Sequence, residues 1–144
     1  MLGISTTSLV GAPLILSTKR DKTPDPAATV KAAQMVNEPL QDVEANKQGT
    51  LYANTNISDA RITDMFQGDE LNNTAQIDLA KVQMFYFTII AVVCFFVMVL
   101  RQLVDATTDL GSLPVLSDGF VAVLGISHGG YLTSKSISHT KSQS

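Results

Sequence analysis

The feature that most constrains this chain is an uninterrupted apolar stretch, Val82–Leu100, which reads VQMFYFTIIAVVCFFVMVL. It holds 19 residues without a formal charge and lies between Lys81 and Arg101. As an α-helix it would be roughly 28 Å long, close to the bilayer's hydrocarbon thickness of about 30 Å. The alternative is a buried helix of a soluble protein, but the rest of the chain offers little apolar sequence to surround one. The stretch therefore predicts a transmembrane helix within residues 79–104.

The remaining composition excludes several classes of function. Ten basic residues stand against 13 acidic ones, a net charge of −3, and no cluster of basic residues marks a nucleic-acid surface. Cys94 is the one cysteine, so the chain cannot form an internal disulfide. The two histidines, His128 and His139, are 11 residues apart, which is not a familiar spacing for metal ligands. We therefore expect no nucleic-acid partner, no metal and no cofactor.

The composition divides the rest of the chain into segments on either side of the predicted span. Residues 1–17 are apolar; a secretory signal is a weak alternative there, because no basic residue precedes the apolar part and Pro13 interrupts it. Residues 18–78 form a polar extramembrane segment, with a short helix expected over 27–36 and a turn at Gln48-Gly49. After the span we expect a loop over 105–117, a second membrane or re-entrant helix over 118–134, capped by Ser117 or Asp118, and a polar tail over 135–144.

A short amphipathic run precedes the span. Ser58 or Asp59 can cap a helix that carries Ile62, Met65 and Phe66 on one face and ends at Gly68. Three apolar residues are too few to build a core, so we expect this face to lie against the membrane surface or against a partner. The membrane helix itself should begin near Thr74 or Ala75 and continue to about Val104.

The sequence Gly125-Ile-Ser-His-Gly129 matches the G-x-S-x-G pattern of a hydrolase nucleophile elbow. Such an elbow needs an acidic residue and then a histidine downstream of the serine. After Ser127 there are 17 residues, and none of them is Asp or Glu. The chain also lacks the alternating strands and helices of a hydrolase sheet. We therefore predict no catalytic residue, and a serine hydrolase is the least favoured alternative.

The same residues fit a helix-packing role. Gly125 and Gly129 have the small-xxx-small spacing that lets two membrane helices approach closely, and Ser127 can add a hydrogen bond. His128 is costly in lipid, so we expect it in the bundle interior or at the headgroup level. The alternative is that the glycines only make this segment flexible and irregular.

The beginning of the chain resembles its end. Residues 2–5 and 124–127 both read Leu-Gly-Ile-Ser, an offset of 122 residues. Carried on, the same offset places Ile15 on Ile137 and Thr18-Lys19 on Thr140-Lys141, so seven of the 19 aligned positions are identical. If this is a repeat, its first copy is shortened, and the counterpart of the span would lie before Met1.

These motifs resemble a group of predicted bacterial inner-membrane proteins of unassigned function, which usually carry two hairpins with a repeated Leu-Pro…Leu-x-Gly-Ile-Ser motif. The resemblance implies an architecture and a location, but no activity, and implies that this chain starts inside the first hairpin. The residues that carry it are Val82-Gln83-Met84, Leu113-Pro114, Leu124–Ser127 and Asp64–Glu70.

The sequence as a whole predicts a mainly α protein with a membrane helical hairpin, one firm span plus a short glycine-rich return helix. Lysine and arginine flank the side that carries 18–78, which favours both ends in the cytoplasm. The function that fits is non-enzymatic: a hairpin that anchors in the lipid bilayer, forms homo-oligomers or joins a larger membrane complex, and presents its polar segment to partners. The alternative is a channel or pore subunit, whose aqueous path would be lined by Gln83, Thr88, Ser127 and His128.

Overall fold

The computed structural model describes residues 2–104 and 114–143, with side chains from residue 6 onward. This part of the chain is mainly helical. The helices and strands are α1 (Leu2–Arg20), α2 (Pro26–Val36), α3 (Leu40–Asn46), β1 (Lys47–Gln48), β2 (Leu51–Tyr52), the 3₁₀ helices η1 (Ile57–Asp59) and η2 (Ile62–Phe66), α4 (Leu79–Val104) and α5 (Asp118–Ser136).

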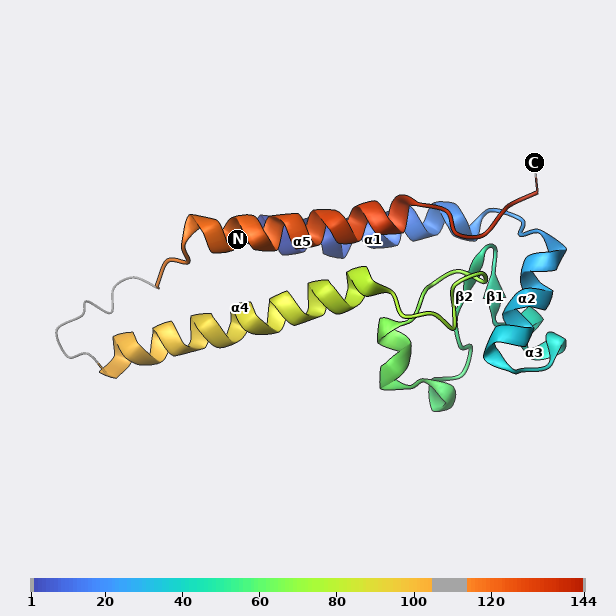
Figure 1. Cartoon of the computed structure of the whole chain (residues 1–144), viewed down its shortest axis with the longest axis horizontal. Helices are drawn as coiled ribbons and strands as arrows, with labels where there is room; N and C mark the ends of the chain where they lie inside the picture. Colours follow the sequence, from blue (N-terminus) through green and yellow to red (C-terminus); the bar gives the residue numbers. More distant parts are fainter. Residues whose placement is uncertain (1, 105–113, 144) are drawn as a thin grey trace.

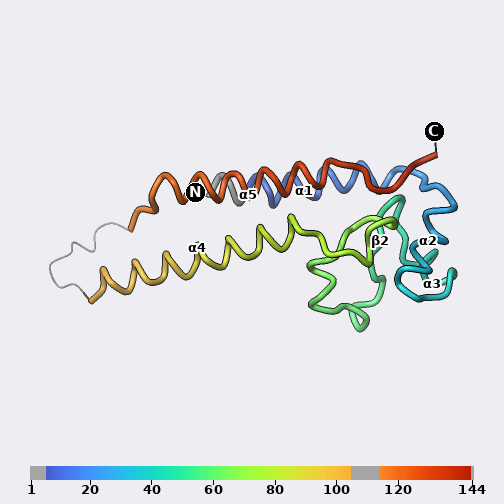
Figure 2. The backbone as a smooth tube through the Cα atoms, in the orientation of Figure 1, coloured from blue at the N-terminus to red at the C-terminus, as the bar shows by residue number. Residues whose placement is uncertain are grey.

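Three long helices form an elongated layer, and everything between α1 and α4 gathers at one end of it (Figure 1). Helix α5 packs against both of the others. It runs parallel to α1 and antiparallel to α4, as the backbone trace shows (Figure 2). The α1–α5 contact is close: a Cβ added to Gly11 would lie 3.1 Å from a methyl carbon of Leu132. The segments that resemble each other in sequence therefore lie side by side.

Helix α4 is the one helix in the described ranges that is long and apolar enough to cross a membrane. None of its 26 residues is buried. Its described residues run from Leu79 to Val104, so the predicted start near Thr74 or Ala75 is wrong. The reason is a better cap, because Asp78 Oδ1 accepts hydrogen bonds from the backbone N–H groups of Ala80 and Lys81 at 3.0 and 3.2 Å.

The polar segment folds into a small unit with its own core. Ala28, Ala32, Val43 and Leu71 are buried together, and Tyr52 packs against them. Helix α2 agrees with the predicted short helix, and the predicted turn joins β1 to β2 with Gly49 in the left-handed region, at φ 61°. We call residues 18–78 the extramembrane unit.

The predicted helix between Ser58 and Gly68 is instead two short 3₁₀ helices. Side chains divert the backbone hydrogen bonds that one helix would need: Asn54 Nδ2 donates to the carbonyl oxygen of Asp59, and Asp64 accepts from the backbone N–H of Arg61 at 2.9 Å. Between the two, Ala60 and Arg61 are extended. Isoleucine and methionine side chains of η2 nevertheless stay exposed.

Helix α5 begins as predicted, with the Ser117 hydroxyl accepting from the backbone N–H of Phe120, and it extends two residues past position 134. Helix α1 continues through Pro13 and ends at Arg20, three residues beyond the apolar segment expected over 1–17. Of the predicted loop over 105–117, residues 105–113 lie outside the described residues.

Candidate functional site

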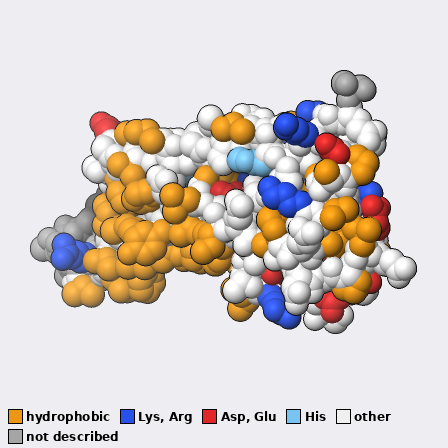
Figure 3. All heavy atoms as spheres, turned by 45° about the vertical axis from the view of Figure 1, so that its right-hand side comes forward, with side chains coloured by type: hydrophobic (Ala, Val, Ile, Leu, Met, Phe, Trp, Pro, Cys, Tyr) orange, Lys and Arg blue, Asp and Glu red, His pale blue; other side chains and the backbone are white. Residues whose placement is uncertain are grey.

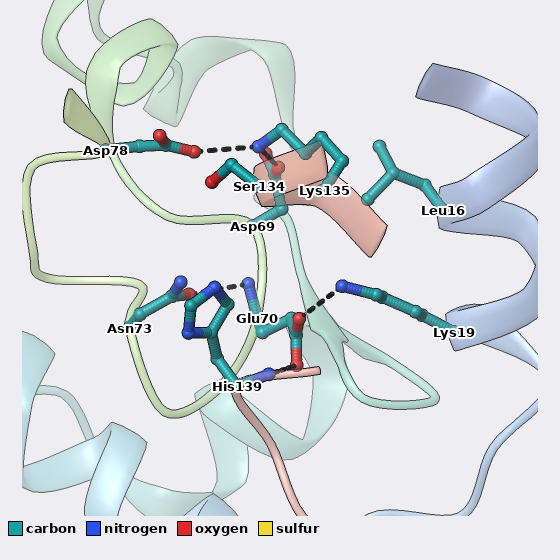
Figure 4. Close-up of a pocket in the computed structure, with 9 residues that line it drawn as sticks. All are labelled: Leu16, Lys19, Asp69, Glu70, Asn73, Asp78, Ser134, Lys135 and His139. Carbon is teal, nitrogen blue, oxygen red and sulfur yellow. Dashed lines mark hydrogen bonds and ion pairs between the residues drawn. The ribbon is translucent and has the colours of Figure 1, made fainter. Parts of the chain in front are cut away.

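Three lysines, one from each long helix, converge on a single stretch of the extramembrane unit. Lys19 is in the last turn of α1, Lys81 in the first turns of α4 and Lys135 in the last turn of α5. Their positions follow from the fold, because the last turns of α1 and α5 and the first turn of α4 all lie at the end of the helical layer that faces the extramembrane unit (Figure 1). Together with three carboxylates they form what we call the juxtamembrane ion cluster, shown in large part in Figure 4: Lys19, Asp69, Glu70, Asp78, Lys81 and Lys135.

Glu70 joins α1 to the C-terminal tail. Its Oε1 accepts from the Lys19 ammonium at 2.6 Å, and both side chains are almost completely buried. Its Oε2 accepts from two backbone N–H groups of the tail, those of His139 at 2.9 Å and Thr140 at 2.6 Å. Lys19 also donates to the carbonyl oxygen of Ile137 at 2.5 Å. Such a buried pair is tolerated because further hydrogen bonds satisfy the charged groups.

Asp69 and Asp78 join α5 to α4. The Lys135 ammonium is bonded to both carboxylates, to Asp78 at 2.9 Å. Lys81 donates to Asp69 at 2.6 Å and to the carbonyl oxygen of Gln67 at 2.6 Å. Asp78 is also the cap of α4, so one carboxylate both starts that helix and holds the end of α5.

The surroundings shift the pKa values of Glu70, Asp78 and Lys135 in the directions that keep these groups charged. Burial acts to raise the pKa of Glu70, but Lys19 and the two backbone donors outweigh it, so the pKa lies below its ordinary 4.5. Burial likewise opposes ionisation of Asp78, yet Lys135 and Lys81 bring its pKa below 3.8. For Lys135 burial favours the neutral form, whereas Asp69 and Asp78 raise the pKa above 10.5. Glu70, Asp78 and Lys135 therefore keep their charges across the neutral pH range.

The cluster encloses almost no free space. Its cavity measures about 10 Å³, and Leu16, Asn73, Ser134 and His139 complete its lining (Figure 4). That volume admits at most one water molecule and no organic substrate. Within the described ranges, no group of three or more His, Cys, Asp or Glu side chains could hold a metal ion. The arrangement thus fastens the three long helices to the extramembrane unit.

The predicted serine and histidine lie on different sides of α5. Ser127 is buried, and its hydroxyl has no hydrogen-bond partner in the described structure. His128 is half-buried towards α1, where its Nδ1 and the hydroxyl of Ser8 are 2.6 Å apart. Sequence reasoning missed the contact with Ser8. The repeat contained a signal for it, since its offset of 122 aligns Ser8 with Gly130, two residues from His128.

The other predicted residues are spread over the helices. Gly125 is half-buried, whereas a Cβ on Gly129 would meet nothing within 4 Å. On α4, Gln83 and Thr88 are exposed, and the Thr88 hydroxyl donates to the carbonyl oxygen of Met84. In the described structure no hydrogen bond joins any two of Gln83, Thr88, Ser127 and His128. The helix-packing and pore-lining roles remain predictions.

The ion cluster itself was not predicted, although its residues flank the apolar segments in the sequence. Comparison with protein-family models, with curated proteins and with solved structures gave no match. The function is therefore inferred from the chain's own residues and their geometry.

Proposed function

We propose that this chain is a non-enzymatic integral membrane protein, in which the hairpin of α4 and α5 anchors the extramembrane unit at the cytoplasmic face of a bacterial inner membrane and presents it to partners. The observation that carries the proposal is the surface of α4. Large apolar side chains are exposed along its whole length, among them Tyr86, Val92, Phe96 and Leu103. Hydrophobic side chains form a dense band on one face of the molecule (Figure 3).

Such a surface is unfavourable in water and favourable in a bilayer. A monomeric soluble protein rarely exposes an apolar patch larger than several hundred Å². Transfer of this surface from water into lipid lowers the free energy by about 25 cal/mol for each Å² of apolar area. Helix α4 also meets the length condition for a bilayer core of about 30 Å.

The ion cluster supports the proposed orientation, because it fixes the extramembrane unit at one end of the helical layer. The C-terminal tail lies at that same end: the backbone N–H of Asp25 donates to Lys141 and that of Gln143 donates to Thr23, at 3.0 and 2.9 Å. Arg20, Lys22 and Lys141 add basic residues there, as expected for a cytoplasmic side. The start of α1 lies away from that end, beside the first part of α5 (Figure 1).

The native cysteine provides a test of the membrane anchor that requires no substitution. Cys94 lies on the exposed surface of α4, near the middle of the apolar stretch. In sealed inverted vesicles it should resist a membrane-impermeant maleimide and react only after detergent is added, while a cysteine placed at Ser142 in a Cys94→Ser background reacts at once. Reaction of Cys94 without detergent, or release of the chain by alkaline carbonate, would refute the anchor.

We further propose that the chain self-associates through the Gly125–Gly129 face. Gly129 is open to its surroundings in the single chain, so Gly129→Leu should clash with nothing inside one copy but should hold a second copy away. Gly130→Leu is the matched control, because Gly130 is equally open but points about 100° away around the helix.

The measurement is the oligomer population in mild detergent. Gly129→Leu should shift it towards monomer and Gly130→Leu should not. Ser127→Ala should have a small effect, because the Ser127 hydroxyl is buried within one copy, has no hydrogen-bond partner among the described residues and is not open to a second copy. Equal populations for Gly129→Leu and the unmodified chain would reject this face as the contact.

A further inference from the structure

The beginning of α4 is surrounded by exposed apolar side chains that belong to the extramembrane unit. Ile62 and Met65 on η2 are 81% and 52% exposed, and Ile77, just before the helix, is 74% exposed. We call Ile62, Met65 and Ile77 the interfacial patch. Figure 1 shows η2 beside the first turns of α4. These three large apolar side chains would gain free energy from transfer out of water into an apolar environment.

The depth of the patch relative to the membrane is fixed by a ring contact. Phe66, the last residue of η2, packs edge-to-face on Phe85 of α4, with ring centroids 5.2 Å apart. Phe85 is the fourth residue of the uncharged stretch and lies about 6 Å along the helix from Lys81, which marks its boundary. A side chain that touches Phe85 therefore lies at or inside the level where lipid headgroups meet acyl chains.

The backbone holds η2 in this place. Residues Gln67 and Ile77 form an antiparallel bridge, and the backbone N–H of Asp78 donates to the carbonyl oxygen of Phe66 at 2.8 Å. Because Asp78 is also the cap of α4, the end of η2 is joined directly to the start of the predicted span. The patch cannot move away from the membrane surface without breaking this connection.

We infer that η2 is a membrane-interface foot, whose interfacial patch inserts into the boundary between headgroups and acyl chains. The inference rests on the proposed membrane insertion of α4. Lipid is the occupant that fits, because Phe66, at the end of the 3₁₀ helix that carries Ile62 and Met65, already contacts the apolar surface of α4. Charge plays little part: Asp59 and Asp64 outnumber Arg61 around the patch, so attraction to anionic headgroups would not drive the insertion.

The foot can be tested with the full chain in vesicles and one environment-sensitive fluorophore at a time. In a Cys94→Ser background, Ile62→Cys carries the label on the patch and Val30→Cys carries it on α2. Val30 is the matched control, because it is also an exposed apolar residue of the extramembrane unit but lies on its far helix. A label on the native Cys94 reports the span itself. Lipids with a spin-label quencher near the headgroup or near the chain end give the depth, and iodide reports exposure to water.

The Ile62 label should be quenched about twofold or more by the shallow lipid quencher, as expected for insertion of about 5–10 Å, and only weakly by iodide. The Val30 label should respond to iodide alone. If Cys94 is quenched by the deep lipid quencher while the Ile62 label responds only to iodide, the foot is refuted and the span stands. Shielding of the Ile62 label from both quenchers would also refute it, because a protein would then cover the patch. Failure of Cys94 to respond to lipid quenchers would refute the membrane anchor itself.

Discussion

Substitution of Glu70 by glutamine probes the ion cluster at its most buried point. Glu70 is 2% exposed and Lys19 is 4% exposed. The carboxylate accepts three hydrogen bonds, from Lys19, His139 and Thr140. A glutamine has one oxygen for these three donors. Whichever way its amide is turned, its NH₂ group faces either the ammonium or the two backbone N–H groups, and Lys19 loses its counter-charge.

The expected cost follows from the burial of the pair. Removing one partner of a buried ion pair costs about 3–5 kcal/mol, because the other charge stays buried without compensation. Lys19→Met alone should cost a similar amount, since it leaves the Glu70 carboxylate buried. The double variant should cost much less than the two single variants added together, because no charge remains buried alone.

Hydrogen exchange of the Leu71 backbone amide measures this cost. That amide donates to the carbonyl oxygen of Thr50 at 3.0 Å, a bond that the substitutions do not alter, and Leu71 is in the core of the extramembrane unit. Its exchange should accelerate by roughly a hundredfold to several thousandfold in Glu70→Gln. Glu44→Gln is the matched control, because Glu44 pairs with Lys47 on the surface, and it should change exchange by less than about fivefold. Acceleration below about threefold in Glu70→Gln, or additive costs in the double variant, would refute the reasoning.

Three further predictions concern pH, backbone strain and topology. The folded pKa values of Glu70 and Asp78 lie below 4.5 and 3.8, so these carboxylates contribute stability above those pH values and lose it as the pH falls below them. The folded pKa of Lys135 lies above 10.5, so Lys135 loses its contribution only as the pH rises past 10.5. Thermal unfolding followed by circular dichroism should therefore show no loss of stability from these three groups between about pH 7 and 9, and a steady decline across that window would contradict it. Gly49→Ala should destabilise the extramembrane unit by at least about 1–3 kcal/mol, because Gly49 has φ 61° and an added Cβ would clash with the carbonyl oxygen of Arg20. Gly130→Ala is the control: its Cβ would meet nothing within 4 Å, so thermal unfolding should show a neutral or slightly stabilising effect. In a Cys94→Ser background, cysteines placed at Lys31 and Ser142 should react with impermeant maleimide from the same side of the membrane. A cysteine placed at Thr107, which lies outside the described residues, should react from the other side. Labelling of the Lys31 and Ser142 positions from opposite sides would overturn the hairpin.

The elements that could be predicted from sequence are those whose signals are local. Nineteen uncharged residues suffice to predict α4, and the end of α2 follows from Glu38-Pro39. The predicted start of α4 failed because Thr74 and Asp78 are both acceptable caps in the sequence, and in the structure it is Asp78 that accepts from the backbone N–H groups of the first turn. The helix expected before Gly68 failed in a similar way, since hydrogen bonds from Asn54 compete with its backbone pattern.

The candidate site could not be predicted because its pairs are distant in sequence. Lys19 and Glu70 are 51 residues apart, and Lys135 and Asp69 are 66 apart. Lysines that flank apolar segments have an ordinary explanation in membrane proteins, which gives no reason to pair them with particular carboxylates. The contact of Ser8 with His128 is the exception, since two copies of one motif were already visible in the sequence.

The parallel packing of α1 on α5 has a consequence for how such a chain can be varied. Two copies of a motif point the same way when the repeat period contains an even number of long helices, and here the period has two: the helix that carries the motif and α4, which lies between α1 and α5. Gain or loss of such a pair leaves every other helix pointing as before, and the lysines at the helix ends stay on the same side. Gain or loss of a single long helix would invert all that follows it and separate Lys135 from its carboxylates. The hairpin, rather than the helix, is thus the smallest unit that this architecture can duplicate or delete.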